Sequence, residues 1–199
     1  MFQNAYFVRH GETTWSKSGQ HTGRTEIPLT EAGVLRARQL APHLAPIGFS
    51  RVLVSPRQRA LQTCEQCGLG ARAETEPNLA EWDYGDYEGK RSAEILAGRP
   101  GWSLFRDGCP GGESPEQVGV RADAVIARVR AMPGNVVLFS HGHFGRVLAA
   151  RWVGQPVIEG QRYLLDTATL GKLGFEHGNP GAPVIALWNY PPSGEPAVP

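Results

Sequence analysis

Short apolar runs alternate with longer amphipathic stretches along this chain. The runs at residues 6–8, 51–54 and 136–139 consist mainly of valine, leucine and aromatic residues, which is typical of strands buried on both faces of a parallel sheet. Each run ends in a polar loop that holds glycine or proline. Two later strands are expected at 168–175 and 184–189, the last of them at an edge of the sheet.

Helix signals fill the segments between the runs. Thr30 begins a helix that covers residues 35–44, and Pro42 is expected to kink or end it early because proline lacks an amide donor. Ser55 and Pro56 together predict the N-cap and first turn of a second helix, which reaches about Cys67.

The clearest helix begins at residue 114. Ser114 to Gln117 form a capping-box pattern with proline in the first turn, and one apolar stripe follows at alternating spacings of four and three. Strands that alternate with such helices predict an α/β layered fold with a largely parallel sheet. The stripe comprises Val118, Ala122, Val125, Val129 and Met132.

The length of 199 residues suits one domain. Segment 77–113 combines tryptophan or tyrosine with glycine turns and shows little periodicity. It is interpreted as a lid-like excursion over the top of the sheet rather than as a second domain. We therefore expect a single domain over residues 1–190 and a flexible, proline-rich tail over residues 191–199.

The composition limits the partners and the compartment. With 20 basic and 19 acidic side chains the net charge is +1, which argues against nucleic acid as a partner. Three cysteines do not make a secreted disulfide framework, and Cys64 and Cys67 are interpreted as small, partly buried helix residues rather than zinc ligands. The N-terminus lacks the pattern of a signal peptide, and no stretch approaches the ~20 apolar residues of a membrane span. A cytoplasmic location without a membrane partner is expected.

Basic and imidazole side chains follow the ends of three predicted strands. Arg9 and His10 follow the first, Arg59 follows the second, and His141 and His143 follow the third. Because ligands of open parallel sheets bind beyond the carboxyl ends of the strands, these side chains are expected to converge with free backbone N–H groups. Such a site suits a dianionic phosphate.

These residue types also suit phosphoryl transfer. A neutral histidine, with one ring nitrogen held by the backbone, could attack phosphorus, and a second histidine could bind a phosphate oxygen. A partly desolvated carboxyl group would protonate the leaving alcohol, and Glu81, among aromatic residues, is the candidate. Arg57 remains an alternative to Arg59. Three neighbouring carboxylates remain alternatives to Glu81: Asp83, Asp86 and Glu88.

The motifs resemble the signature of the histidine phosphatase superfamily, the phosphoglycerate mutase-like proteins. The resemblance covers about residues 5–177 and rests on ordered motifs at family spacing. They are Val8-Arg9-His10-Gly11-Glu12-Thr13, the segments 15–23 and 28–33, Ser55-Pro56 with Arg59-Ala60, the segment 81–89, and Ser140-His141-Gly142-His143.

The resemblance implies a three-layer α/β/α sandwich in which His10 is the phosphorylated nucleophile. It implies a phosphate pocket made of Arg9, Arg59 and His141, and it makes Glu81 the proton donor and then the base for water. It implies no metal and no cofactor. The implied substrate-contacting positions are Ser16, Thr22, Gly23, Tyr84, Gly142 and His143.

The sequence leaves the roles of two further histidines open. His143 is interpreted either as a substrate contact or as a local helix cap. His21 is a loop residue that could line the pocket.

Within the superfamily, segments 15–23, 82–89 and 106–109 resemble the branch that contains sedoheptulose-1,7-bisphosphatase. This implies a phosphatase of small phosphorylated metabolites, such as sugar phosphates or bisphosphates. The alternative of a bisphosphoglycerate-dependent phosphoglycerate mutase is weakened by the shorter chain and by Phe105-Arg106, where mutases carry adjacent arginines. A metallophosphatase and a catalytically silent protein that binds a phosphorylated ligand are further alternatives. The expected partner is a small phosphorylated substrate, and a homodimer is one of the open oligomeric states.

Overall fold

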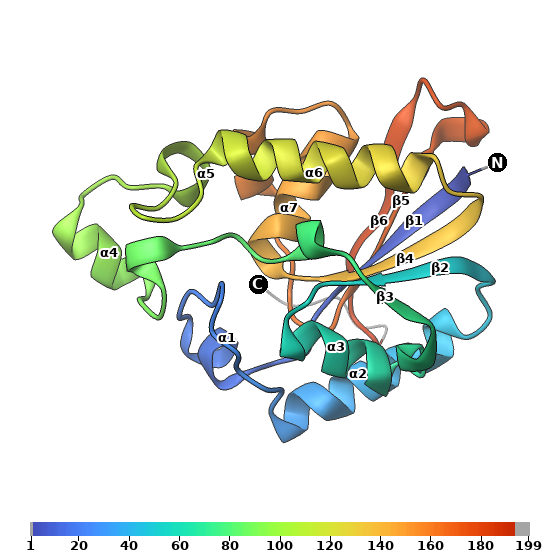
Figure 1. Cartoon of the computed structure of the whole chain (residues 1–199), viewed down its shortest axis with the longest axis horizontal. Helices are drawn as coiled ribbons and strands as arrows, with labels where there is room; N and C mark the ends of the chain where they lie inside the picture. The colour runs from blue at the N-terminus through green and yellow to red at the C-terminus, as the bar shows by residue number, and fades with distance from the viewer. Residues whose placement is uncertain (1, 194–199) are drawn as a thin grey trace.

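The computed structural model describes residues 2–193, and within them six strands form one sheet with helices on both faces (Figure 1). Residues 194–199 of the predicted tail lie outside the described residues. The strands are β1 (Phe2–Arg9), β2 (Phe49–Val54), β3 (Ala73–Thr75), β4 (Gly134–Ser140), β5 (Leu170–Phe175) and β6 (Pro183–Tyr190). The helices are α1 (Thr14–Ser18), α2 (Glu31–Leu44), α3 (Gln58–Gln66), α4 (Ser92–Gly98), α5 (Leu104–Asp107), α6 (Pro115–Arg130) and α7 (Gly142–Trp152). This is the three-layer arrangement that the sequence predicts.

The strand order across the sheet is β3-β2-β4-β1-β5-β6. The neighbours among β3, β2, β4 and β1 are parallel, whereas β5 is antiparallel to β1 and β6 is antiparallel to β5. The sheet is thus mixed, with a parallel part that contains the three basic strand ends. Arg9 pairs with Ser140, and Val54 pairs with Phe139, so β1, β4 and β2 end at nearly the same level. The loops that follow these strands therefore lie side by side.

Successive strand residues enter two different cores, because side chains alternate between the faces of a sheet. Phe7, Leu53 and Leu138 pack in the core beneath α6 and α7, whereas Val8 and Phe139 pack in the core beneath α2 and α3. All five are buried. Burial on both faces explains why these runs are continuously apolar.

The helix predicted from the capping box is confirmed as α6, where the Ser114 hydroxyl accepts a hydrogen bond from the amide of Gln117. The early break expected at Pro42 is wrong, because α2 continues to Leu44. Proline removes only one amide donor there, and Leu40 and Leu44 are completely buried in the core beneath the helix. The burial of these side chains offsets the missing hydrogen bond.

The start of α3 differs from the prediction. The helix begins at Gln58, three residues after Ser55. The Ser55 hydroxyl accepts a hydrogen bond from the Arg57 amide, before the helix, and forms another with the His141 ring. The amide of Gln58 donates to the carboxylate of Glu26 at 2.8 Å. A carboxylate from a distant loop thus satisfies the free amide at this helix end.

Cys64 and Cys67 are more deeply buried than expected, with exposed fractions of 0% and 5%. The Cys67 thiol donates to the carbonyl oxygen of Ala37. Burial raises the pKa of both thiols to about 12, so they remain protonated and packed in the core.

Segment 77–113 extends beyond the carboxyl ends of the strands and carries α4 and α5 (Figure 1). Trp82 and Tyr84 of this segment are buried and belong to the core cluster that also contains Phe7 and Phe144. Buried aromatic rings therefore anchor the segment to the rest of the domain.

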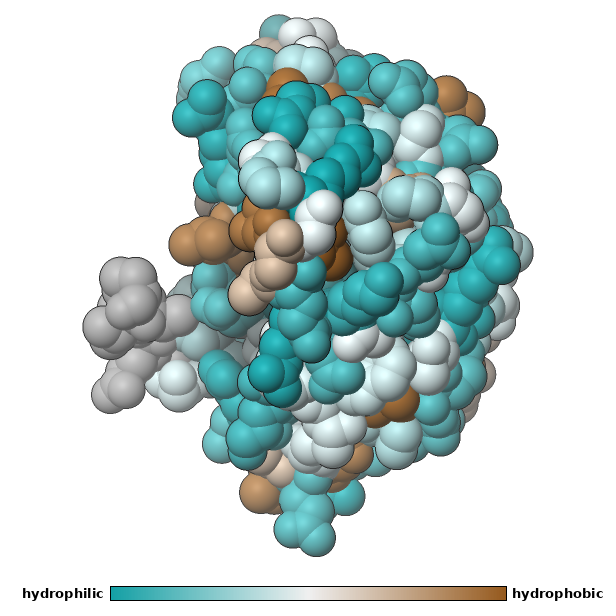
Figure 2. All heavy atoms as spheres, turned by 90° about the vertical axis from the view of Figure 1, so that its left-hand side faces the viewer, coloured by the Kyte–Doolittle hydropathy of each residue, from teal (hydrophilic) through white to brown (hydrophobic). Residues whose placement is uncertain are grey.

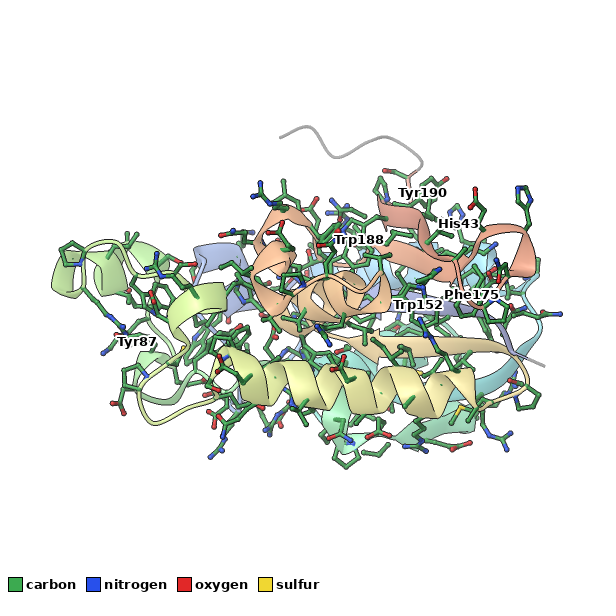
Figure 3. The ribbon with its side chains drawn as sticks, turned by 90° about the horizontal axis from the view of Figure 1, so that it is seen from above. His43, Tyr87, Trp152, Phe175, Trp188 and Tyr190 are labelled. Carbon is green, nitrogen blue, oxygen red and sulfur yellow. The ribbon has the colours of Figure 1, made fainter. Side chains whose placement is uncertain are left out.

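Both predicted late strands are confirmed as β5 and β6, and β6 forms an edge of the sheet. Trp152 lies beside Phe175, with ring centroids 5.5 Å apart (Figure 3). Tyr190, at the end of β6, packs against His43 of α2, with ring centroids 5.7 Å apart. In residues 2–193 no helix is both long and apolar enough to cross a membrane.

The contact between α7 and β1 depends on the absence of a side chain at Gly145. A Cβ there would lie 2.4 Å from the Phe7 ring, so we expect Gly145→Ala to lower the free energy of unfolding by about 1–3 kcal/mol. Gly98→Ala in α4 is the control, because a Cβ there meets no atom within 4 Å. Urea unfolding of both variants measures the difference, and equal stabilities would contradict this packing.

Candidate active site

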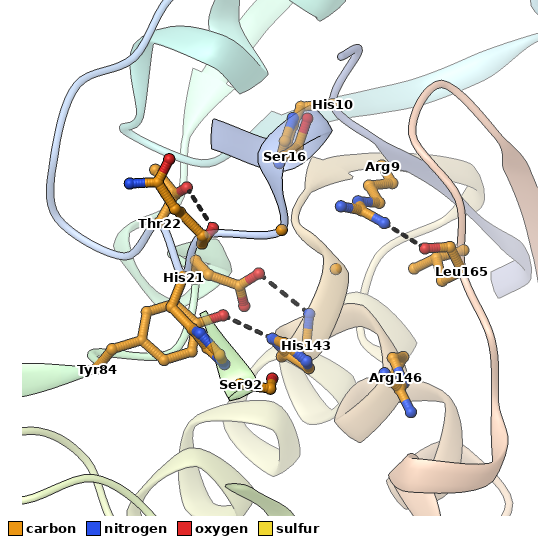
Figure 4. A pocket seen from close by; sticks show the side chains of 14 residues that line it. Arg9, His10, Ser16, His21, Thr22, Tyr84, Ser92, His143, Arg146 and Leu165 are labelled. Atoms are coloured by element: carbon orange, nitrogen blue, oxygen red, sulfur yellow. Dashed lines mark hydrogen bonds between the residues drawn. The ribbon is translucent and has the colours of Figure 1, made fainter. Parts of the chain in front are cut away.

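A pocket of about 170 Å³ opens where β1 and β4 end (Figure 4). The loops after β1, the excursion segment and the first turns of α7 surround it. The molecular surface on this side is mainly hydrophilic (Figure 2). The lining residues are Arg9, His10, Ser16, Gly19, Gln20, His21, Thr22, Glu81, Tyr84, Ser92, Gly142, His143, Arg146 and Leu165.

His10 presents one fixed ring nitrogen to this pocket. Its Nδ1 lies 2.7 Å from the carbonyl oxygen of Gly11, so Nδ1 carries the proton and Nε2 holds the free lone pair. Burial lowers the pKa of His10 well below its usual 6.5, and the nearby charges of Arg59 and Arg9 lower it further. The ring is therefore neutral at physiological pH, with a nucleophilic nitrogen available.

Arg9 brings a positive charge to the same pocket. Its Nη1 donates to the carbonyl oxygen of Leu165, and among the described residues its buried Nε has no hydrogen-bond partner. Gly142 permits this arrangement, because a Cβ at that position would lie 3.2 Å from the Arg9 guanidinium carbon. Burial lowers the pKa of Arg9, yet a guanidinium is basic enough to stay charged. A buried guanidinium with an unpaired N–H is suited to an anion.

His141 lies directly behind His10, with ring centroids 5.2 Å apart. It is completely buried and does not line the pocket. Its Nδ1 accepts a hydrogen bond from Arg59 Nε at 3.1 Å, and its Nε2 lies 2.6 Å from the Ser55 hydroxyl. Burial and the charge of Arg59 lower the pKa of His141 well below 6.5.

Arg59 is also completely buried, and it does not line the pocket. Its terminal nitrogens donate to the carbonyl oxygens of Thr22, Gly23 and Thr25. The predicted phosphate pocket is therefore divided in this structure. Arg9 faces the cavity, while Arg59 and His141 form the layer behind it and hold the loop after β1.

Glu81 is the carboxylate of its segment that lines the pocket. It is 8% exposed and accepts hydrogen bonds from the amides of Trp82, His143 and Phe144 at 2.8–3.0 Å. Two of these amides belong to the first turn of α7, so the helix start fixes the carboxylate beside the cavity.

The neighbouring carboxylates of the segment make other contacts. Asp83 forms an ion pair with Arg24 at 2.6 Å, and Glu88 accepts hydrogen bonds from the amides of Gly23 and Thr25. Asp86 is exposed. Their placement favours Glu81 among the four candidates.

The substrate-contacting positions are brought together with one exception. Ser16, Thr22, Tyr84, Gly142 and His143 line the pocket. Gly23 does not line it, because its amide points to a carboxylate and a Cβ there would lie 2.7 Å from the Trp82 carbonyl oxygen.

His143 has its ring in the pocket and lies in the first turn of α7. Its Nδ1 and the Tyr84 hydroxyl share a hydrogen bond of 2.6 Å. Burial lowers the pKa of His143 and raises that of Tyr84, so both side chains are uncharged. Of the two interpretations of His143, the ring position favours the substrate contact.

Sequence reasoning missed several lining residues, of which Arg146 carries charge. Arg146 lies one helical turn beyond Gly142 and His143 on α7, and its Nε donates to the carbonyl oxygen of Gly160 at 3.0 Å. Its spacing of three and four residues from these positions could have revealed it, since such residues share a helix face. Ser92, at the start of the short helix α4, and Gln20, in the loop after α1, carried no comparable signal.

A neutral imidazole, a buried guanidinium and a carboxylate thus line one small cavity. The profile of the histidine phosphatase superfamily (branch 1) matches residues 5–190. The chain belongs to this superfamily, and it is a phosphatase that hydrolyses phosphomonoesters.

Individual relatives agree with this assignment. The chain is 43% identical to an acid phosphatase of Mycobacterium tuberculosis, with 92% of each chain covered. It is 30% identical to the sedoheptulose 1,7-bisphosphatase of Saccharomyces cerevisiae, with 90% of each covered. A solved structure of an open reading frame product of Mycobacterium tuberculosis superposes with a TM-score of 0.89 at 39% identity, covering 96% of this chain and 98% of that one.

The environment of His10 predicts an unusual titration. Because burial and two guanidinium groups disfavour the imidazolium, the ring should stay neutral as the pH falls through 6.5 and take up a proton only at lower pH. Histidine ring signals followed by NMR across a pH series, with His10→Ala for assignment, measure this directly. A His10 titration midpoint at or above 6.5 would contradict the described environment.

Proposed function

We propose that this phosphatase acts on phosphomonoesters of small hydroxylated metabolites, sugar phosphates or bisphosphates, through a phosphohistidine on His10. The observation that carries the proposal is the orientation of His10. Its Nδ1 is held by the Gly11 carbonyl oxygen, and its free Nε2 belongs to a cavity that Arg9 and Glu81 also line. These three groups supply a nucleophile, an anion-binding cation and a proton donor.

The first chemical step forms a bond between His10 Nε2 and phosphorus. The bond between phosphorus and the ester oxygen breaks, and the leaving alcohol takes a proton from Glu81. This order requires Glu81 to be protonated when the substrate is bound.

The second step releases phosphate. Glu81, now ionised, takes a proton from water, and the water oxygen attacks phosphorus as the bond to His10 breaks. The amides at the start of α7 hold the carboxylate in place for both steps. Glu81 thus gives up a proton in the first step and takes one up in the second, so one carboxyl group serves as acid and then as base.

The charges around the cavity support a phosphate dianion as the bound group. Arg9 and Arg146 line the cavity with two guanidinium groups, against the single carboxylate of Glu81. The N-terminus of α7 adds a partial positive charge at the same place. The excess of positive charge stabilises three phosphate oxygens as charge moves in the transition state.

Two observations support a sugar phosphate over phosphoglycerate isomerisation. One named relative is a sedoheptulose bisphosphatase at 30% identity. Arg106, near the positions where mutases carry adjacent arginines, forms an ion pair with Asp107 at 2.7 Å and does not line the cavity. Phosphoglycerate mutase remains the alternative, because other relatives are called probable phosphoglycerate mutases. The cytoplasmic location and the lack of a membrane partner stay predictions, and so does the lack of a nucleic-acid partner, which the net charge of +1 supports.

The substrate proposal is tested by a kinetic panel. We expect phosphate release from sedoheptulose 1,7-bisphosphate or fructose 1,6-bisphosphate with a higher kcat/KM than from 3-phosphoglycerate. Isomerisation of 3-phosphoglycerate that depends on bisphosphoglycerate, with slow phosphate release, would establish the mutase alternative instead.

Removal of the nucleophile should eliminate catalysis. We expect His10→Ala to lower kcat by at least about 10⁴-fold, because the covalent step has no other route. A phosphate-release assay at saturating substrate measures it, and His43→Ala, which alters a histidine of α2 that does not line the cavity, is the control. Appreciable residual turnover would contradict the assignment of His10.

The loss of kcat on removal of the acid should depend on the leaving group of the substrate. Glu81→Gln should lower kcat for sugar phosphates by about 10²–10⁴-fold, and should affect an aryl phosphate much less because a phenolate leaves without a proton. Steady-state kinetics on both substrates measure the difference, with the exposed neighbour Asp86→Asn as control. Equal losses on both substrates would show that Glu81 is not the acid.

A further inference from the structure

The cavity has two chemically different ends. His10 and Arg9 lie at one end, and Ser92 lies at the other (Figure 4). The lining also includes the uncharged polar side chains of Gln20, His21 and Thr22, together with the charged Glu81 and Arg146. The charged end suits phosphate. The polar end must contact whatever organic group the phosphate carries.

His21 is held rigidly at the polar end. Its Nδ1 lies 2.7 Å from the carbonyl oxygen of Lys90, and its backbone amide donates to the same oxygen at 2.9 Å. The ring stacks on His143, with centroids 5.8 Å apart and planes 10° apart, and meets the edge of Tyr84 at 4.7 Å. The side chain is 6% exposed. These contacts leave the ring one orientation.

The hydrogen bond to Lys90 decides which ring nitrogen can serve a ligand. A carbonyl oxygen only accepts, so Nδ1 of His21 carries a proton, and this leaves Nε2 as the acceptor nitrogen of the ring. Among the described residues Nε2 has no hydrogen-bond partner, and the ring lines the cavity. A rigid, unpartnered acceptor therefore faces the place of the organic group.

The acceptor selects between classes of substrate. A lone pair repels a carboxylate oxygen, so a phosphorylated acid would place its carboxylate at the guanidinium groups of Arg9 or Arg146 rather than at His21. The guanidinium groups of Arg9 and Arg146 in the same cavity disfavour an ammonium group. A hydroxyl group remains, because it is a neutral donor.

We propose that His21 is a specificity-determining residue whose Nε2 accepts a hydrogen bond from a hydroxyl of a phosphorylated polyol. This inference rests on the proposed function, since it assigns the far end of the same cavity. The phosphoryl group binds at His10, and the hydroxyl-bearing chain extends toward His21 and Ser92. The enzyme thus prefers a hydroxylated chain to an alkyl chain of the same length.

Two substrates and two variants test this assignment. Erythritol 4-phosphate and butyl phosphate have the same carbon chain, and only the first has hydroxyl donors. His21→Asn keeps an N–H near the position of Nδ1 for the Lys90 oxygen but loses the distal acceptor. His21→Gln does the reverse, because its amide reaches the position of Nε2. The readout is the ratio of kcat/KM for the two substrates.

We expect the wild-type ratio to favour erythritol 4-phosphate and His21→Asn to lower that ratio by roughly 3- to 10-fold, the value of one neutral hydrogen bond. His21→Gln should retain most of it. The opposite pattern, in which His21→Asn keeps the ratio and His21→Gln loses activity on both substrates, would assign His21 a structural role and overturn the proposal. A wild-type ratio near one would also overturn it, while phosphate release from both esters would leave the phosphatase function intact. If the enzyme released phosphate from none of these substrates, the two esters and the sugar bisphosphates alike, that result would instead count against the proposed function.

Discussion

The parallel pairing of β1 with β4 is the constraint on which the site depends. The register places Arg9 opposite Ser140, so the next residues, His10 and His141, leave the sheet together and bring their rings to 5.2 Å. The pairing of β2 with β4 brings Ser55 to the same level, where it hydrogen-bonds with His141. Residues separated by more than a hundred positions meet because three buried strands end side by side.

Burial then sets the charge state of these rings. Desolvation disfavours protonation of His10 and His141, and the positive charges of Arg59 and Arg9 add to this effect. The neutral His10 ring is oriented by one backbone oxygen. Arg59 serves the site from behind, since its hydrogen bonds to His141 and to the loop carbonyl oxygens hold the wall of the cavity in place. The cost of burying two arginines is offset by these contacts and by the anion that the cavity is suited to bind.

Much of this arrangement could be predicted from the sequence, because local signals and strand-end positions were consistent with one another. The capping box at Ser114 predicts α6, and the polar residues after apolar runs predict where ligands bind. The remaining features depend on contacts between distant segments. Glu26, in a loop more than thirty residues earlier, binds the first amide of α3. Arg9 faces the cavity and Arg59 lies behind it because their guanidinium groups donate to different backbone carbonyl oxygens. No local pattern encodes such contacts.

The covalent role of His10 is tested most directly by trapping the phosphorylated enzyme during turnover. Rapid quenching in alkali, followed by mass spectrometry of the peptide that contains residue 10, locates the phosphoryl group. The described geometry predicts an acid-labile phosphate on Nε2 of His10, formed and lost at rates that match turnover. An enzyme that turns over without this species, or that carries phosphate on a different residue, would contradict the account.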